Sequence, residues 1–121
     1  MSPINHWESS MKREFTRIYK AMFGKGPDHT TVKIVDDMIM MKIEGALTPI
    51  EQNLIQTEGG HLLVRQIRDK MVLDQQSEYV TVVENLLNVK VDNISYTFNS
   101  DGQAMYLFMV LHRSAYPCNA S

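Results

Sequence analysis

Two pairs of predicted strands, each joined by a short polar turn, constrain the fold of this chain more than any other feature. The strands are expected over residues 31–35, 38–44, 89–98 and 103–111, which are rich in β-branched and long apolar residues. Asp36 and Asp37 join the first pair, and residues 99–102 join the second. Because strands joined by a tight turn run antiparallel, a doubly wound parallel sheet is excluded.

Three of these strands suggest how the sheet is covered. In residues 89–98 the apolar residues change parity midway, so a β-bulge near Asp92 and Asn93 would keep them on one face. Residues 103–111 are apolar on both parities, which predicts a central strand that is covered on both faces or lies in an interface. Met38 and Met40 share the outer face of the second strand and indicate that this face is also partly covered.

A first helix is predicted over residues 8–23, because its apolar residues recur at spacings of three and four. Gly24 then ends the helix and Pro27 prevents its resumption. The segment from Gly24 through Gly26 to Pro27 could also be a glycine loop for an anion. It lacks the spacing of a phosphate loop and follows a helix instead of preceding one, so we interpret it as a helix stop and turn.

The clearest local signal is a capping box. Thr48 is expected at the N-cap, Pro49 at the first helical position and Glu51 at the third, so that Thr48 and Glu51 satisfy each other's backbone amides. This signal predicts a second helix from Pro49 to about residue 57, before Gly59 and Gly60 loosen or end it.

Residues 61–87 have a helical pattern that lapses at residues 74–78, which leaves one helix or two as alternatives. A single helix would be about 40 Å long at ~1.5 Å per residue. A four-stranded sheet is only about 15 to 20 Å wide at a strand spacing of ~4.8 Å. The overhang must be solvated, kinked or packed on another subunit, and it is the main indication of a homodimer in the sequence.

The element order α-β-β-α-α-β-β predicts an α+β fold, a two-layer sandwich in which helices pack on an antiparallel four-stranded sheet of two hairpins. The chain has 121 residues, 44% of them hydrophobic, which suits one domain over residues 1–112. Residues 113–121 are expected to be a flexible polar tail. The nine methionines suit an adaptable core or an adaptable binding surface.

Charge and apolar runs exclude several classes of protein. The 12 Lys and Arg against 14 Asp and Glu give a net charge of −2, which argues against a nucleic-acid binder or a polybasic membrane adhesin. The longest apolar run, residues 104–111, is too short to span a bilayer. With no secretory signal and a lone cysteine, Cys118, the chain is expected to be cytoplasmic.

The strongest candidate for an anion or partner site lies at the start of the third helix. It consists of Gly59, Gly60, His61, Arg65 and Arg68. The glycines leave free backbone amides, and two arginines three residues apart share a helix face and can grip a carboxylate or phosphate. The more ordinary interpretation is that both arginines pair with Glu58, Asp69 or another subunit.

Other candidates for chemistry are weaker. The four histidines show no paired ligand spacing, and the methionines of residues 38–41 alternate between strand faces, so no metal or cofactor is predicted. Asp36 and Asp37 resemble a carboxylate pair, but turn formation explains both. No catalytic residues are assigned, and an enzyme is not a favoured class.

Three separated motifs resemble one bacterial family. They are IYKAMFGKGP (residues 18–27), IEGALTPIE (residues 43–51) and LVRQIR (residues 63–68), and the resemblance covers residues 8–112. The family is a domain of unknown function, also called MpsC-like after a component of a sodium-translocating, membrane-potential-generating system. Its pattern often has a glycine near Asn88, and asparagine is the residue that best replaces glycine in the left-handed conformation.

The resemblance implies a small cytoplasmic bacterial protein whose genes sometimes accompany membrane components linked to cation or inorganic-carbon transport. It implies no catalytic residues. The favoured function is therefore a non-catalytic accessory or regulatory homodimer that acts through protein contacts, with membrane transporter subunits as candidate partners. The alternative is a small-molecule or anion-binding sensor that uses the Gly59–Gly60 helix start with Arg65 and Arg68.

Overall fold

The computed structural model describes residues 3–45, 47–99 and 103–115. Its elements are α1 (Pro3–Phe23), β1 (His29–Val35), β2 (Met38–Glu44), α2 (Pro49–Leu54), α3 (Gly60–Leu87), β3 (Val91–Phe98) and β4 (Ala104–Leu111). This order confirms the predicted α-β-β-α-α-β-β sequence and the α+β class.

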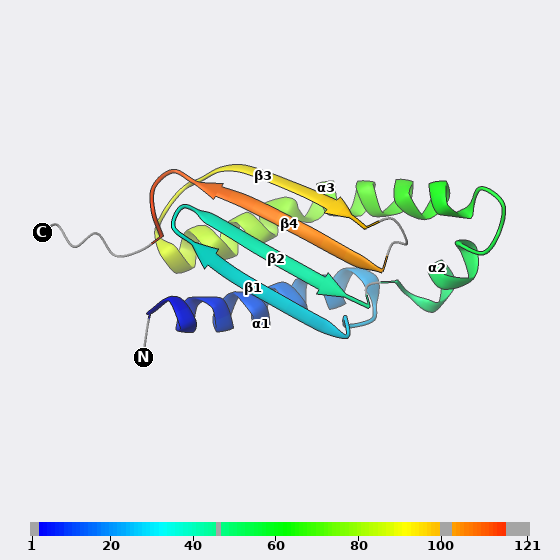
Figure 1. Ribbon diagram of the computed structural model, residues 1–121, viewed down its shortest axis with the longest axis horizontal. Helices are drawn as coiled ribbons and strands as arrows, with labels where there is room; N and C mark the ends of the chain where they lie inside the picture. The colour runs from blue at the N-terminus through cyan, green and yellow to red at the C-terminus, as the bar shows by residue number, and fades with distance from the viewer. Residues whose placement is uncertain (1–2, 46, 100–102, 116–121) are drawn as a thin grey trace, which may run out of the picture.

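The four strands form one antiparallel sheet in the order β1-β2-β4-β3 (Figure 1). The two predicted hairpins are present, and they join through β2 and β4, where Met41 lies opposite Leu107. The predicted bulge is also present, because the register of β3 against β4 shifts between Val91 and Asn93. β2 and β4 are therefore the central strands, as their apolar composition requires.

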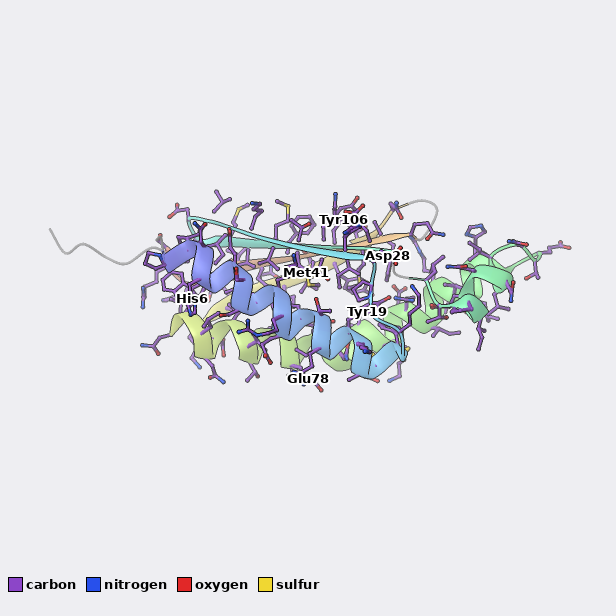
Figure 2. The ribbon with its side chains drawn as sticks, turned by 90° about the horizontal axis from the view of Figure 1, so that it is seen from below. His6, Tyr19, Asp28, Met41, Glu78 and Tyr106 are labelled. Atoms are coloured by element: carbon purple, nitrogen blue, oxygen red, sulfur yellow. The ribbon has the colours of Figure 1, made fainter. Side chains whose placement is uncertain are left out.

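The helices α1 and α3 cover one face of the sheet, so the molecule is a two-layer sandwich (Figure 2). Side chains on this face of the sheet are buried against the apolar stripe of α1 and the inner face of α3. The centre of this core includes Phe15, Tyr79, Met41, Met105 and Leu107. Figure 2 shows Met41 on the helix side of the sheet and Tyr106 on the opposite side.

Helix α1 is longer than its periodicity predicted. It begins at Pro3 instead of residue 8, and Ile4 and Trp7 in the added turns pack against the core. It ends at Phe23 as expected, where Gly24 has φ +76° and donates its amide to the carbonyl of Lys20 at 2.8 Å. The N-terminal extension was missed because residues 3–10 are mostly polar and give a weak apolar repeat.

The other boundaries differ from the prediction by a few residues. Strand β1 is longer than predicted, because it begins at His29 instead of residue 31, whereas α2 and β3 are shorter. Helix α2 ends at Leu54 instead of residue 57, and β3 begins at Val91 instead of residue 89. Residues 60–87 form one helix of 28 residues, without a break where the apolar stripe lapses. It ends at Asn88, which is left-handed with φ 55° and ψ 41°, as its exchange with glycine in the family pattern suggested.

The overhang expected for a single long helix is present. Figure 1 shows α2 and the N-terminal part of α3 beyond the end of the sheet. On α2 and the first half of α3, the apolar residues Ile50, Leu62, Leu63 and Ile67 are 42% to 73% exposed.

The start of the predicted tail is attached to the domain. Ala115 is buried, and its amide donates to the carbonyl of Asp36 at 2.8 Å. The rest of the predicted tail, including Cys118, lies outside the described residues.

Candidate functional site

A buried polar cluster lies where α1, α2 and α3 meet. The Nε of Arg68 donates to Oε2 of Glu51 at 2.6 Å, its Nη2 donates to Oε1 of the same carboxylate, and its Nη1 donates to the Tyr19 hydroxyl at 2.7 Å. The guanidinium carbon lies 3.9 Å from the centre of the Phe23 ring. Arg68 is only 1% exposed, so a large cationic side chain is held inside the protein by ionic, hydrogen-bonding and cation–π contacts.

The capping box explains why Glu51 is in place for this contact. Thr48 accepts from the Glu51 amide at 3.3 Å, and Glu51 Oε1 accepts from the Thr48 amide at 2.8 Å, as predicted. The same carboxylate therefore both caps α2 and neutralises Arg68. The start of α2 thus fixes the position of the Glu51 carboxylate, and Arg68 of α3 donates to it.

The electrostatic balance keeps this pair ionised. Burial opposes the charge on Glu51, but the hydrogen bonds from Arg68 and the Thr48 amide outweigh it and lower the pKa of that carboxyl. Burial likewise opposes the charge on Arg68, and its hydrogen bonds to Glu51 and Tyr19 outweigh burial and raise its pKa. Burial raises the pKa of the Tyr19 hydroxyl, which stays protonated. The cluster thus carries no net charge at neutral pH.

Arg65 and Arg68, the two arginines of the predicted site, have different surroundings in the structure. Three donors of Arg68 bind Glu51 and Tyr19, so its guanidinium is occupied by the protein itself. Within the described part of the chain, neither Glu58 nor Asp69 forms an ion pair with Arg65 or Arg68. Asp69 instead accepts from the Tyr96 hydroxyl at 2.9 Å. Partial burial and this hydrogen bond raise the pKa of Tyr96 to about 12.

His61 and Arg65, two other residues of the predicted site, line a groove between α2, α3 and the end of β3. Its volume is about 370 Å³. Five apolar residues form its walls: Leu47, Ile55, Leu62, Val64 and Phe98. Its polar lining consists of His61, Arg65, Arg68 and Asn99. The structure therefore brings His61 and Arg65 together in a concave site. Arg68 also lines this site, but its guanidinium is bound to Glu51.

Gly59 and Gly60 lie in the turn between α2 and α3, directly before His61. Gly59 is left-handed, with φ +74°, and caps α3 without a side-chain hydrogen bond. Gly60 is buried where the chain reverses, and any side chain there would meet the carbonyl of Leu54. Both glycines serve the turn that brings α3 back beside α2.

The segment from Gly24 to Pro27 is the turn between α1 and β1. The ammonium of Lys25 in this segment donates to the carbonyl of Gly45 at 3.2 Å. The left-handed Gly24 confirms the helix stop. Asp36 and Asp37 likewise lie in the β1–β2 turn, and their carbonyls accept from Ala115 and Leu111.

The outer face of the sheet, on the side away from the helices, is a second candidate site. Its exposed apolar residues are Val35 (56%), Met38 (51%), Met40 (42%), Val110 (40%) and Phe108 (36%), which we call the outer patch. Met38 lies opposite Val110 and Met40 opposite Phe108 on the central strands, so the patch is contiguous. Strand β4 thus has apolar residues on both faces of the sheet: one face is buried under the helices, and the other is exposed.

The described residues contain no group of three or more His, Cys, Asp or Glu side chains able to hold a metal ion. Among the helices described, none has both the length and the apolar character needed to cross a bilayer.

Together, the fold and these surfaces define a small α+β sandwich protein with an apolar outer sheet face and a cationic groove. The chain belongs to the family described as "Na+-translocating membrane potential-generating system (MpsC)", whose model matches residues 5–113. This result confirms the resemblance found in the three sequence motifs.

One relative and the solved structures complete the comparison. The chain is similar to the uncharacterized protein YbcI of Bacillus subtilis (strain 168), with 31% identity over 65 residues. That alignment covers 54% of this chain and 52% of YbcI, so the chain spans about half the length of the curated relative it matches. No solved structure matches this chain.

Proposed function

We propose that this chain is a non-catalytic accessory or regulatory protein that acts through protein contacts and forms a homodimer through its outer patch. The outer patch carries the proposal. Five large apolar side chains, each at least 36% exposed, lie together on β1, β2 and β4. A contiguous apolar area of this kind is typical of a protein–protein interface.

A second copy of the chain suits this surface. Lys33, Lys42 and Glu44 lie on the same face of β1 and β2 as the patch, and Lys42 already pairs with Glu44 at 3.4 Å. A two-fold interface brings the same surface together from both copies, so a border with both signs of charge can pair with itself. The net charge of −2 gives little repulsion between copies.

The mass of the protein in solution tests this interface. We expect Phe108→Lys to shift wild-type dimers to monomers, because it places a charge in the centre of the apolar contact. Leu73→Lys is the matched control: Leu73 is an apolar residue of α3 that is 55% exposed and lies in the helical layer. A Phe108→Lys protein that keeps the wild-type mass, or an equal loss in the control, would refute the outer patch as the interface.

The family name and the exposed apolar residues of α3 support a proposal for the cellular role. We propose that the protein is cytoplasmic and serves a membrane transport system for a cation or inorganic carbon made of other chains. The apolar side chains Leu62, Leu63 and Ile67 offer the contact surface. Cross-linking in the native host should join the protein to integral transport subunits, and Leu63→Lys should remove the product without changing the dimer. Cross-links to soluble proteins alone would contradict this role.

A second candidate function is binding of a small anion as a sensor domain. The groove favours it, because His61 and Arg65 converge there in a cavity of about 370 Å³. Titration with small anions, followed by calorimetry, tests this candidate. Binding that is lost in Arg65→Gln supports it, and the absence of binding of any anion contradicts it.

A further inference from the structure

We infer that the groove between α2, α3 and the end of β3 binds a small amphiphilic monoanion, a carboxylate attached to an apolar chain. This inference rests on the second candidate function and specifies its ligand. It follows from three properties of the groove: its size, the nature of its walls and the positive charge of Arg65, which is not paired with Glu51.

The size of the groove sets the size of the ligand. Its volume of about 370 Å³ lies near the lower end of ligand pockets, which run from roughly 300 to 1,000 Å³. At roughly 30 Å³ for each water-sized group, this space holds about a dozen non-hydrogen atoms. A ligand with eight to ten carbons therefore fills it, whereas an inorganic anion leaves most of it empty.

The walls require an apolar body. Leu47 and Val64 are buried side chains of the groove, and Leu62 is 62% exposed. The side chains of these residues cannot form hydrogen bonds with a hydrated anion. Binding becomes more favourable when a hydrocarbon chain displaces water from them. An ion without an apolar portion makes no use of this surface.

The charge requires a single anionic group. Arg68 is neutralised by Glu51, which leaves Arg65 as the cation of the groove, and Arg65 forms no hydrogen bond or ion pair with another described residue. No acidic residue is among the described residues that line the groove. A guanidinium binds a carboxylate through two parallel hydrogen bonds. The amide of Asn99 and the imidazole of His61 add donors in the same cavity.

Isothermal titration of the full chain with sodium octanoate tests the inference. Octanoate should bind, and octanamide, which has the same chain without the charge, should bind at least about tenfold more weakly because a charge-assisted hydrogen bond is lost. Arg65→Gln should weaken octanoate by a similar factor and leave octanamide unchanged. Arg13→Gln removes the same charge from the exposed face of α1 and should change neither affinity.

Each remaining outcome contradicts part of the argument. Sodium sulfate or acetate binding as tightly as octanoate would overturn the amphiphilic ligand but leave an anion site in place. Equal binding of octanamide would overturn the role of charge. No binding of any of these probes would overturn both this inference and the second candidate function. Sedimentation with phosphatidylglycerol vesicles, blocked by Arg65→Gln, would assign the site to a lipid surface and overturn a free carboxylate.

Discussion

The guanidinium of Arg68 and the carboxylate of Glu51 form a two-point ion pair inside the protein, with 1% and 8% of their side chains exposed. Glu51 belongs to the first turn of α2 and Arg68 to the third turn of α3. The Tyr19 hydroxyl extends the pair to α1. This contact fixes the overhanging helices to the body of the domain and so positions the groove beside them.

Removing Arg68 should be strongly destabilising. Arg68→Met leaves the Glu51 carboxylate buried without its partner, and we expect a loss of about 3–5 kcal/mol in the free energy of unfolding. Urea denaturation measures this change. Arg17→Met is the control, because Arg17 pairs with Glu14 at 3.0 Å on the surface and its loss should cost less than about 1 kcal/mol.

A second substitution should recover part of that loss. In the Arg68→Met background, Glu51→Gln removes the unpaired charge while its side-chain oxygen still accepts from the Thr48 amide. The double variant should therefore be more stable than Arg68→Met alone, by an amount that a double-mutant cycle measures. Strictly additive losses would contradict the coupling of the two residues.

Acid should destabilise the protein through the same pair. Since the pKa of Glu51 is lower in the folded state than its ordinary value of 4.5, the unfolded chain binds this proton more readily. The stabilisation is complete above about pH 4.5 and is lost as the pH falls through the lower, folded-state pKa. Unfolding curves between pH 3 and 7 should show a steeper loss for the wild type than for Glu51→Gln. Parallel curves would contradict this assignment.

The adjacent glycines at the start of α3 should respond differently to substitution. Gly59 is left-handed with open space around it, so Gly59→Ala should cost about 1–2 kcal/mol and Gly59→Asn less. Gly60 lies against the Leu54 carbonyl, so Gly60→Ala should cost about 3 kcal/mol and Gly60→Asn more. Thermal or urea unfolding gives this ranking. If asparagine is tolerated better than alanine at Gly60, the close approach is wrong.

Asn88 should tolerate glycine but not a β-branched residue. Its φ of 55° ends α3, and its amide donates to the carbonyl of Glu84 at 2.9 Å. Asn88→Gly should leave stability nearly unchanged, whereas Asn88→Val should cost about 1–2 kcal/mol. A denaturation midpoint that is equal in the two variants would contradict the left-handed cap.

Features set by neighbouring residues could be predicted from the sequence. The capping box depends on residues only three apart, and the hairpin turn on two adjacent aspartates, so both were found correctly. The bulge of β3 also follows from local pattern, and the left-handed Asn88 was implied by the glycine of the family pattern at that point. Local geometry of this kind is nearly independent of the rest of the fold.

Features set by the folded chain could not be predicted. Arg68 meets a carboxylate 17 positions earlier and a hydroxyl 49 positions earlier, so its partners depend on how α1, α2 and α3 meet. The apolar pattern of β4 predicts two apolar faces but does not say that α1 and α3 cover only one of them. Arg65 and His61 of the predicted site line one groove, while Arg68 has structural partners that the sequence did not indicate.

The mass of the wild-type protein in solution is the most direct test of the proposed contact function. Sedimentation equilibrium over concentrations from about one to several hundred micromolar should give a species of twice the 13.9 kDa chain mass. A species that remains at 13.9 kDa throughout this range would contradict the homodimer and leave the outer patch without its proposed partner.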